Sequence, residues 1–310
     1  MKEPRGSELI ERYKNNYCIA PDAPISEEMI LRHWELEKEL TQKLLESTPE
    51  NRFEVFEECY SKLYSELIWL NEYVKKNIPY STMDRGFRIW LTLIGAPSTQ
   101  RIYEVGSGKA ELISFLARNG YSCVATEITR ERGKKYSEEN VTWQNSDGVH
   151  FGTFEQHGSY DVVISDQVIE HVHPDDTQDH FRGVHEILKP NGKYIFRVPH
   201  RFTGPHDVSK VFKCEKALGM HLREMTFHET RKLINNSGFS KFGIVLIGAR
   251  KIIIKMFSKD RMISTSFYFH SLILIEGIIR LIPGRKNRLS AIRMAARVGF
   301  FPDIFVVAIK

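Results

Sequence analysis

From Arg101 onward, the sequence alternates between short runs rich in β-branched residues and segments with helical periodicity. Strand-like runs are RIYEV, SCVATEI, VTWQNSD, YDVVISD and KYIFRVP, and the helical segments between them end at turn formers such as Gly120, Pro190 and Gly192. Strands that alternate with helices across short links predict a parallel sheet built from right-handed crossovers. A further helix, TFHETRKLINNSGF, and the runs KFGIVLI and FPDIFVVAIK complete the pattern. We therefore predict a doubly wound α/β fold with a seven-stranded, mostly parallel sheet.

Two segments of the chain lie outside this alternation. Residues 1–97 carry apolar stripes at helical spacing, and Ser26 followed by Glu27 and Glu28 is a favourable helix start. We expect three helices there: one from Ser26, one over 48–71 and one over 84–93. The predicted organisation is a helical cap region at 1–97, the ligand-binding core at 98–247, a basic amphipathic helical insertion at 248–300 and the last strand at 301–310.

Composition points to a reduced, cytoplasmic setting. The four cysteines are scattered, with no CxxC pair, and the charged N-terminus MKEPRGSELIERYKNN lacks the apolar run of a secretion signal. The net charge of +5 is concentrated late in the chain: residues 250–297 hold eleven Lys and Arg against Asp260 and Glu276. The rest of the chain is weakly acidic.

The loop after the first predicted strand, EVGSGKAEL, limits the kind of ligand that can bind. Gly106 and Gly108 allow a tight turn and close approach of a ligand, as in nucleotide-binding turns. A dinucleotide fingerprint would have a third glycine at position 111, but this chain has Glu111, and Glu104 stands before the loop. Both carboxylates disfavour a diphosphate. A ligand that carries positive charge and no phosphate suits this loop better.

Six motifs in order resemble those of class I S-adenosylmethionine-dependent methyltransferases of the small-molecule type, over residues 101–247. They are EVGSGKAEL, VATEIT, NSDG, YDVVISDQVIEHV, EILKPNGKYIFRVP and HLREMTFHETRKLINNSGF. The loop departs from the usual pattern at Ala110, where a glycine is common. The resemblance implies a Rossmann-like fold, methyltransferase activity and S-adenosylmethionine as the cofactor, whose sulfonium and ammonium groups match the acidic loop.

The resemblance also assigns cofactor contacts, position by position. Glu104, Gly106 and Gly108 would line the methionine end of the cofactor. Glu127, with Ile128 beside it, would accept hydrogen bonds from the ribose hydroxyls. The adenine would be bound by Asp147 and Gly148, and the cofactor would be flanked by Asp166 and Gln167.

Methyl transfer is an in-line displacement, so the protein must align the acceptor and, for a hydroxyl, remove its proton. Histidine suits that role near neutral pH. We predict that the catalytic base is among His171, His200 and His221, while His173 and His206 are further candidates. His171 could instead support the cofactor pocket. We expect no metal, because the sequence shows no histidine array backed by a matching acid.

The insertion contains an apolar run, residues 267–282, that is interrupted by His270, Glu276 and Arg280. It is shorter than the roughly 20 clean residues of a membrane span. An amphipathic helix on the inner face of a membrane fits its basic flanks. Alternatively, the same face packs on the core or on a second subunit, which leaves a homodimer open. Nucleic acid is disfavoured, because the charges alternate with aliphatic residues and no aromatic platform is present.

We therefore predict a methyltransferase that acts on a small or lipid-linked polar acceptor, most simply at an oxygen of a sugar or metabolite. The long, basic and apolar insertion before the last strand resembles insertions in methyltransferases of bacterial glycan and lipid-linked sugar assembly. Three alternatives stay open: a quinone or lipid O-methyltransferase, a non-catalytic scaffold subunit of the same fold, and a nicotinamide oxidoreductase. Glu104 and Glu111 disfavour the last.

Overall fold

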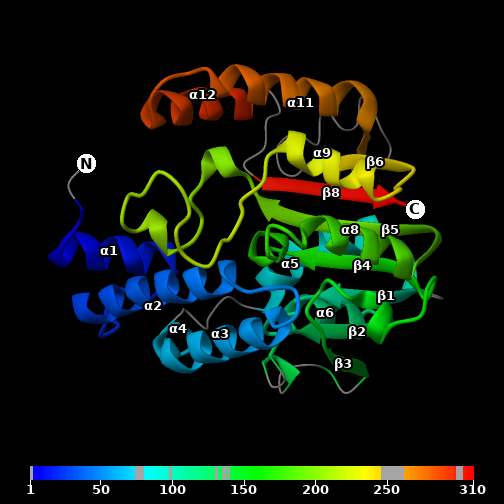
Figure 1. The fold of residues 1–310 in the computed structure, drawn as a ribbon, viewed down its shortest axis with the longest axis horizontal. Helices are drawn as coiled ribbons and strands as arrows, with labels where there is room; N and C mark the ends of the chain where they lie inside the picture. The colour runs from blue at the N-terminus through cyan, green and yellow to red at the C-terminus, as the bar shows by residue number, and fades with distance from the viewer. Residues whose placement is uncertain are drawn as a thin grey trace.

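A central sheet runs through the molecule, and helices cover both its faces and one of its ends (Figure 1). The computed structural model describes residues 3–73, 80–97, 100–129, 132–134, 138, 140–245, 262–297 and 303–310. The strands are β1 (Arg101–Val105), β2 (Ser122–Glu127), β3 (Val141–Asn145), β4 (Tyr160–Asp166), β5 (Leu188–Pro199), β6 (Lys241–Val245), β7 (Met262–Ser264) and β8 (Asp303–Ile309).

The sheet order is β3-β2-β1-β4-β5-β8-β6-β7. Strands β1 to β5 pair in parallel, whereas β8 is antiparallel to both β5 and β6. The predicted seven-stranded, mostly parallel sheet is confirmed. The structure adds β7, a three-residue strand antiparallel to β6 at the edge, which the sequence analysis did not anticipate.

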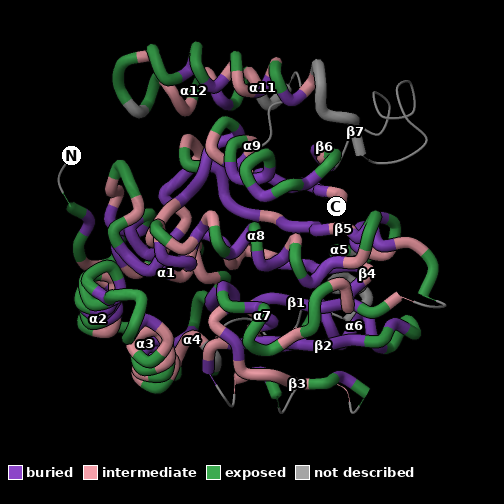
Figure 2. Tube along the Cα trace, turned by 45° about the vertical axis from the view of Figure 1, so that its right-hand side comes forward, coloured by how far each residue is buried: buried purple, intermediate pink, exposed green. Residues whose placement is uncertain are grey.

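Two layers of apolar side chains hold the sheet between helices. On one face, α8 (Thr177–Ile187) and α9 (Phe227–Asn236) cover Tyr103, Tyr194 and Phe196. On the other, α5 (Tyr80–Ile94) and α6 (Glu111–Arg118) cover Ile102, Ile164 and Ile195. Buried residues therefore follow the strands through the centre of the molecule (Figure 2). A short helix, α7 (Phe151–Phe154), follows β3.

The N-terminal helices are α1 (Gly6–Asn16), α2 (Glu27–Leu45), α3 (Arg52–Glu66) and α4 (Ile68–Glu72). They lie beside the carboxyl ends of the parallel strands (Figure 1). The Ser26 side chain accepts a hydrogen bond from Met29 N at 3.2 Å, so the predicted start of α2 is confirmed. The predicted helix over 48–71 is two helices separated at Leu67, α1 was not predicted, and α5 begins before the expected residue 84.

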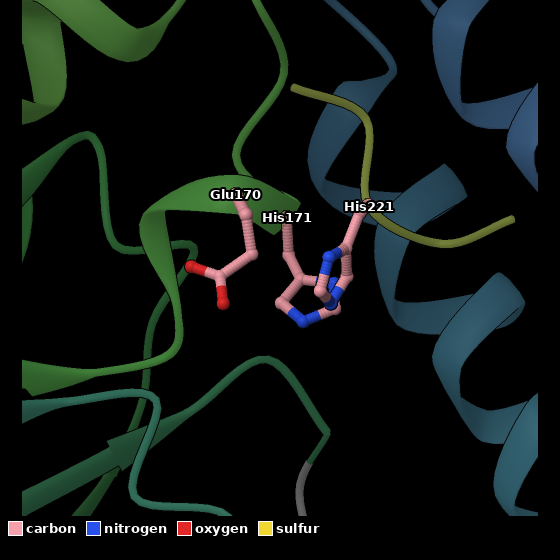
Figure 3. A group of neighbouring side chains, drawn as sticks. All are labelled: Glu170, His171 and His221. Carbon is pink, nitrogen blue, oxygen red and sulfur yellow. The ribbon is translucent and has the colours of Figure 1, made fainter. Parts of the chain in front are cut away.

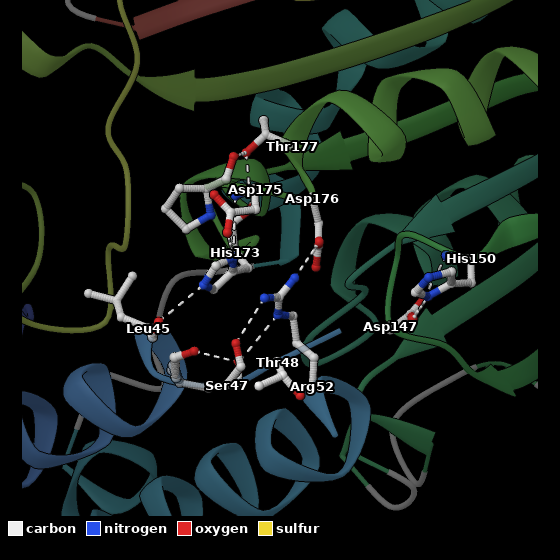
Figure 4. A network of polar contacts seen from close by, with 12 residues as sticks. Leu45, Ser47, Thr48, Arg52, Asp147, His150, His173, Asp175, Asp176 and Thr177 are labelled. Carbon is white, nitrogen blue, oxygen red and sulfur yellow. Dashed lines mark hydrogen bonds and ion pairs between the residues drawn. The ribbon is translucent and has the colours of Figure 1, made fainter. Parts of the chain in front are cut away.

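The N-terminal helices are fastened to the core by polar contacts (Figure 4). Arg52 forms an ion pair with Asp176, just before α8, and its Nη2 donates to Ser47 O at 2.9 Å. His173 lies 3.4 Å from the Leu45 carbonyl oxygen through Nε2. These contacts hold the end of α2 and the start of α3 at the loop that follows β4.

The insertion forms two helices, α11 (Thr265–Arg280) and α12 (Arg285–Arg297), above β6 and α9 in Figure 1. One side of the pair joins the core through Phe269, Leu272, Ile279 and Ile292. No helix among the described residues is long and apolar enough to cross a membrane. Residues 246–261, which include five of the eleven basic residues of 250–297, lie outside the described residues. The sequence also predicts a short helix around 130–139, and most of that range lies outside them as well.

Candidate active site

The glycine loop joins β1 to α6 in a backbone conformation that few residues adopt. Gly106 and Gly108 have φ angles of +63° and +55°. A Cβ at Gly106 would lie 2.8 Å from Cγ2 of Val168, so a side chain there meets both strain and a steric clash. Ala110, the departure from the usual pattern, also takes a positive φ of 60° at the N-terminus of α6. The loop therefore keeps the glycine-type turn despite the alanine.

Glu127, the last residue of β2, stabilises this loop through a hydrogen bond to its backbone. Its Oε2 accepts a hydrogen bond from Gly108 N at 2.9 Å, and its Oε1 accepts one from Ile128 N at 3.1 Å. Burial raises the pKa of Glu127 to about 7, although both backbone hydrogen bonds favour the carboxylate. The carboxylate faces the cavity, where hydroxyl donors can reach it.

Glu104 lies at the root of the loop and forms no ion pair with a described residue. It is 4% exposed, and its Oε2 has no hydrogen-bond partner among the described residues. Burial raises the pKa of Glu104 to about 8, and the nearby carboxylates of Asp166 and Glu127 raise it further. A positively charged group bound in the cavity would favour the ionised form. This observation fits a ligand with an ammonium or sulfonium group.

The other predicted contacts lie at the ends of β3 and β4. The Asp147 carboxylate closes a turn by accepting from Val149 N and His150 N at 2.8 and 2.9 Å, and it contacts the His150 ring (Figure 4). Asp166 is engaged by Arg197 in a two-pronged ion pair of 2.7 and 2.6 Å. Gln167 follows with a φ of 59°. Asp166 therefore holds the strand ends together as well as facing the cavity.

These residues surround one cavity of about 510 Å³. All nine predicted cofactor residues line it: Glu104, Gly106, Gly108, Glu127, Ile128, Asp147, Gly148, Asp166 and Gln167. The N-terminal helices and the segment after β5 supply much of the remaining wall. Sequence reasoning did not identify these residues, which include Tyr17, Glu37, Phe56, Tyr60, Tyr64, Asp207 and Met220. These side chains lie outside the loop and strand-end motifs of the cofactor site, and the predicted helical cap region at 1–97 was the one signal that pointed to those of them that come from the N-terminal helices.

Two of the three predicted catalytic histidines meet at this cavity. His171 lies on the 3₁₀ turn η3 (Ile169–His171), and His221 comes from the loop before α9. Their ring centroids are 4.8 Å apart with the rings nearly perpendicular, at 89°. Burial and the neighbouring His221 lower the pKa of His171 to about 3. The pKa of His221 is raised: burial lowers it, but the Glu224 hydrogen bond and nearby carboxylates outweigh that effect.

His200 is in a different place, and the structure does not support it as a base. It is fully buried, outside the residues that line the cavity, and its Nε2 lies 2.6 Å from Oε1 of Glu276. Its Nδ1 accepts a hydrogen bond from Phe202 N at 3.1 Å, so both ring nitrogens are engaged. Of the further candidates, His206 lines the cavity and His173 does not.

Comparisons with known proteins identify the type of domain. Residues 103–196, from β1 through most of β5, match the methyltransferase domain family. The chain contains a class I S-adenosylmethionine-dependent methyltransferase domain. The methyltransferase is an enzyme, and S-adenosylmethionine is its cofactor, so the sequence predictions of family, activity and cofactor are confirmed.

Solved structures of similar methyltransferases are distant in sequence. One is a methyltransferase from Archaeoglobus fulgidus, 15% identical, covering 74% of this chain and 94% of its own, with a TM-score of 0.49. Another, from Mesorhizobium loti, is 14% identical, and the match covers 76% of this chain and 99% of its own, with a TM-score of 0.46. A third is the Burkholderia thailandensis 1,6-didemethyltoxoflavin-N1-methyltransferase with bound 1,6-didemethyltoxoflavin and S-adenosylhomocysteine. It is 14% identical, the match covers 63% of this chain and 81% of its own, and the TM-score is 0.46. No curated protein matches this methyltransferase.

Proposed function

We propose that the enzyme transfers a methyl group to an oxygen of a small or lipid-linked polar acceptor, such as a sugar or another hydroxylated metabolite. The observation that carries this proposal is the pair His171 and His221 in the wall of the same cavity as the glycine loop. An amine or carbanion acceptor has less need of such a pair, whereas a hydroxyl must lose its proton as it reacts.

Hydrogen bonds set the orientation of both rings. Nδ1 of His171 lies 2.9 Å from Met220 O, a pure acceptor, so this nitrogen carries the hydrogen. Nδ1 of His221 lies 3.1 Å from Oε1 of Glu224 in the same manner. Each neutral ring therefore keeps its acceptor lone pair on Nε2. We propose that the hydroxyl binds beside these Nε2 atoms and that its proton passes to one of them as the O–C bond forms.

The reaction is then a displacement at the methyl carbon. The acceptor oxygen forms the new O–C bond while the C–S bond breaks, and its electron pair stays on sulfur to give neutral S-adenosylhomocysteine. Glu104, beside the glycine loop, would stabilise the positive charge of the bound cofactor. The wall of N-terminal helices would position the acceptor.

Titration calorimetry with S-adenosylhomocysteine tests the cofactor site, with NADH as the comparison ligand. We expect micromolar binding that is at least tenfold weaker in Glu127→Ala and unchanged in Glu186→Ala, an exposed glutamate on α8. Radiolabelled methyl transfer to a panel of sugars, phenols and lipid-linked sugars then tests the acceptor. Binding of NADH alone would favour the oxidoreductase. Binding of S-adenosylhomocysteine with no transfer to any hydroxyl acceptor would favour the scaffold subunit.

We also propose that the enzyme is cytoplasmic and works at the inner face of a membrane, where a lipid-linked sugar or quinone would be presented. The side of α11 and α12 that does not join the core exposes Leu274, Ile278, Leu281 and Met294, which are 56–83% exposed. Arg280, Lys286 and Arg293 lie exposed in the same segment. Apolar side chains flanked by basic ones are the composition that binds anionic lipid surfaces.

A further inference from the structure

Three side chains next to the reaction centre form a group with the composition of a metal site. Glu170 and His171 project from η3, and His221 approaches from the loop before α9 (Figure 3). One potential ligand atom from each residue lies within 4.8 Å of the others. Sequence analysis named His171 and His221 as separate candidates for the base, but it could not predict the group, because His221 is about fifty residues away from Glu170 and His171.

Glu170 is the unusual member of the group. It is 1% exposed, and neither carboxylate oxygen has a hydrogen-bond partner on any other described residue. An isolated buried carboxylate is costly, so it must either take up a proton or meet a cation. In Figure 3 the Glu170 side chain lies beside the two imidazoles.

The two histidines are arranged as metal ligands are. Each Nδ1–H donates to an oxygen: His171 to the Met220 carbonyl oxygen and His221 to the Glu224 carboxylate. Such partners fix the tautomer and leave Nε2 free to bind an ion, and they are the usual outer contacts of metal-bound histidine. Both rings face the cavity, so an ion between them would keep an open position toward the acceptor.

We propose that Glu170, His171 and His221 bind a divalent transition-metal ion of the zinc, cobalt or manganese type, which holds the acceptor oxygen. Two imidazoles and one carboxylate suit these ions, whereas magnesium and calcium prefer oxygen ligands alone. Ligand atoms lie about 2.0–2.2 Å from a zinc ion. The three potential ligand atoms lie within 4.8 Å of one another, so small rotations of the side chains bring them all to this distance from one ion.

This inference rests on the proposed function and refines its proton step. The acceptor hydroxyl would bind the ion through its oxygen and lose its proton to solvent water, because a bound divalent cation stabilises the anion. The acceptor oxygen would then form the new O–C bond to the methyl carbon, while the electron pair of the breaking C–S bond would go to sulfur. His171 and His221 would act as ligands in this step, and Glu224 would be a positioning residue that orients His221.

Cobalt is the probe for the test, since its visible absorption bands report the ligand set. Tag-free, chelator-treated protein is titrated with Co²⁺, and the variants Glu170→Gln and His221→Ala are compared with His157→Ala, whose side chain is 72% exposed. We expect stoichiometric binding and a raised Tm in the parent and in the His157 variant. Binding should be at least tenfold weaker in the other two variants.

Binding of S-adenosylhomocysteine to the same metal-free samples distinguishes failure of the proposed metal site from failure of the proposed methyltransferase function. If S-adenosylhomocysteine binds but Co²⁺ gives no absorption bands, or gives the same bands in Glu170→Gln, the metal site is wrong and the proposed methyl transfer stands. Unchanged or increased stability of Glu170→Gln without metal would then identify Glu170 as a protonated, neutral carboxyl. If S-adenosylhomocysteine does not bind either, the proposed function itself fails.

Discussion

Glu276, within α11, presents its carboxylate to His200 at the end of β5, with Oε1 2.6 Å from Nε2. The same carboxylate accepts hydrogen bonds from the backbone N–H groups of Phe227 and His228, the first two residues of α9, the latter at 3.0 Å. One buried acid thus stabilises the start of a core helix and binds the insertion to the core. From the sequence, Glu276 was an interruption of an apolar run and one of two acids in a basic segment, and neither observation predicted this role.

Replacing Glu276 should therefore destabilise the domain. Glu276→Ala leaves the His200 N–H and two N-terminal helix amides without their acceptor, and such losses cost about 3–5 kcal/mol for a broken buried pair. Urea unfolding followed by circular dichroism measures the change. Glu11→Ala, an exposed glutamate on α1, serves as the control and should change the unfolding free energy by less than about 0.5 kcal/mol. Equal stability of the two variants would show that the insertion is not fastened through this carboxylate.

The fold and the cofactor half of the site could be predicted because they depend on local patterns. Glu127 ends a strand 19 residues after Gly108, and the parallel register brings it back to that same backbone amide. The acceptor half could not be predicted in this way. Glu37 and Tyr60 come from segments without a motif, and tertiary packing alone brings them to the cavity. His221 opens one of the motifs, but its sequence context did not show that it lies beside His171.

The histidines show the limit most clearly. His200 and His221 look alike in the sequence, each within a polar stretch with nearby charged residues. Folding buries His200 against Glu276, whereas His221 is placed beside Glu170 and His171. Residue type indicates which chemistry is available, but only the packing shows which histidine can reach a ligand.

Gly106→Ala should weaken cofactor binding. The new Cβ would lie 2.8 Å from Val168 Cγ2 at a φ of +63°, and the left-handed conformation alone costs about 1–2 kcal/mol for alanine. We expect at least tenfold weaker binding of S-adenosylhomocysteine by calorimetry, and partial recovery in Gly106→Ala with Val168→Ala. Gly152→Ala is the matched control, because its nearest atom would be 3.9 Å away and its φ is ordinary. Full binding by Gly106→Ala would contradict the close approach of the loop.

The raised pKa of Glu104 predicts how the stability of the free enzyme changes with pH. Its carboxyl keeps its proton up to pH of about 8 when folded but loses it near 4.5 when unfolded, so the unfolded state binds fewer protons between these values. Its contribution to stability therefore falls as pH rises through this window. Glu104→Gln stays neutral, so its stability relative to the parent should increase with rising pH, by on the order of 4 kcal/mol at pH 8. A constant difference from pH 5 to 8, as expected for Glu186→Gln, would contradict the raised pKa.

Cofactor binding should release protons for the same reason. The positive charge of S-adenosylmethionine favours ionised Glu104, and ribose hydroxyls favour ionised Glu127, whose pKa in the free protein is about 7. At pH 6.5, binding enthalpies measured in buffers of different ionisation enthalpy should show net proton release, reduced in Glu104→Gln. Proton uptake, or release equal in the variant and the parent, would mean that Glu104 does not respond to the ligand charge.

The surface of α11 and α12 yields the last prediction. Leu281, directly after α11, is 83% exposed, and Ile278 is 56% exposed beside basic residues. If this surface binds lipid, the enzyme should co-sediment with vesicles that contain anionic lipid, less with neutral vesicles and less as salt increases. Ile278→Asp with Leu281→Asp should abolish the binding, since it removes apolar contact and adds negative charge. Leu45→Asp, a substitution at a 45% exposed position on α2, should bind as the parent does. Absence of vesicle binding by the parent would instead assign the surface to a second subunit or to packing within the chain. Sedimentation equilibrium of the parent and the same variants would separate those two, because only the loss of a dimer contact lowers the measured molecular mass.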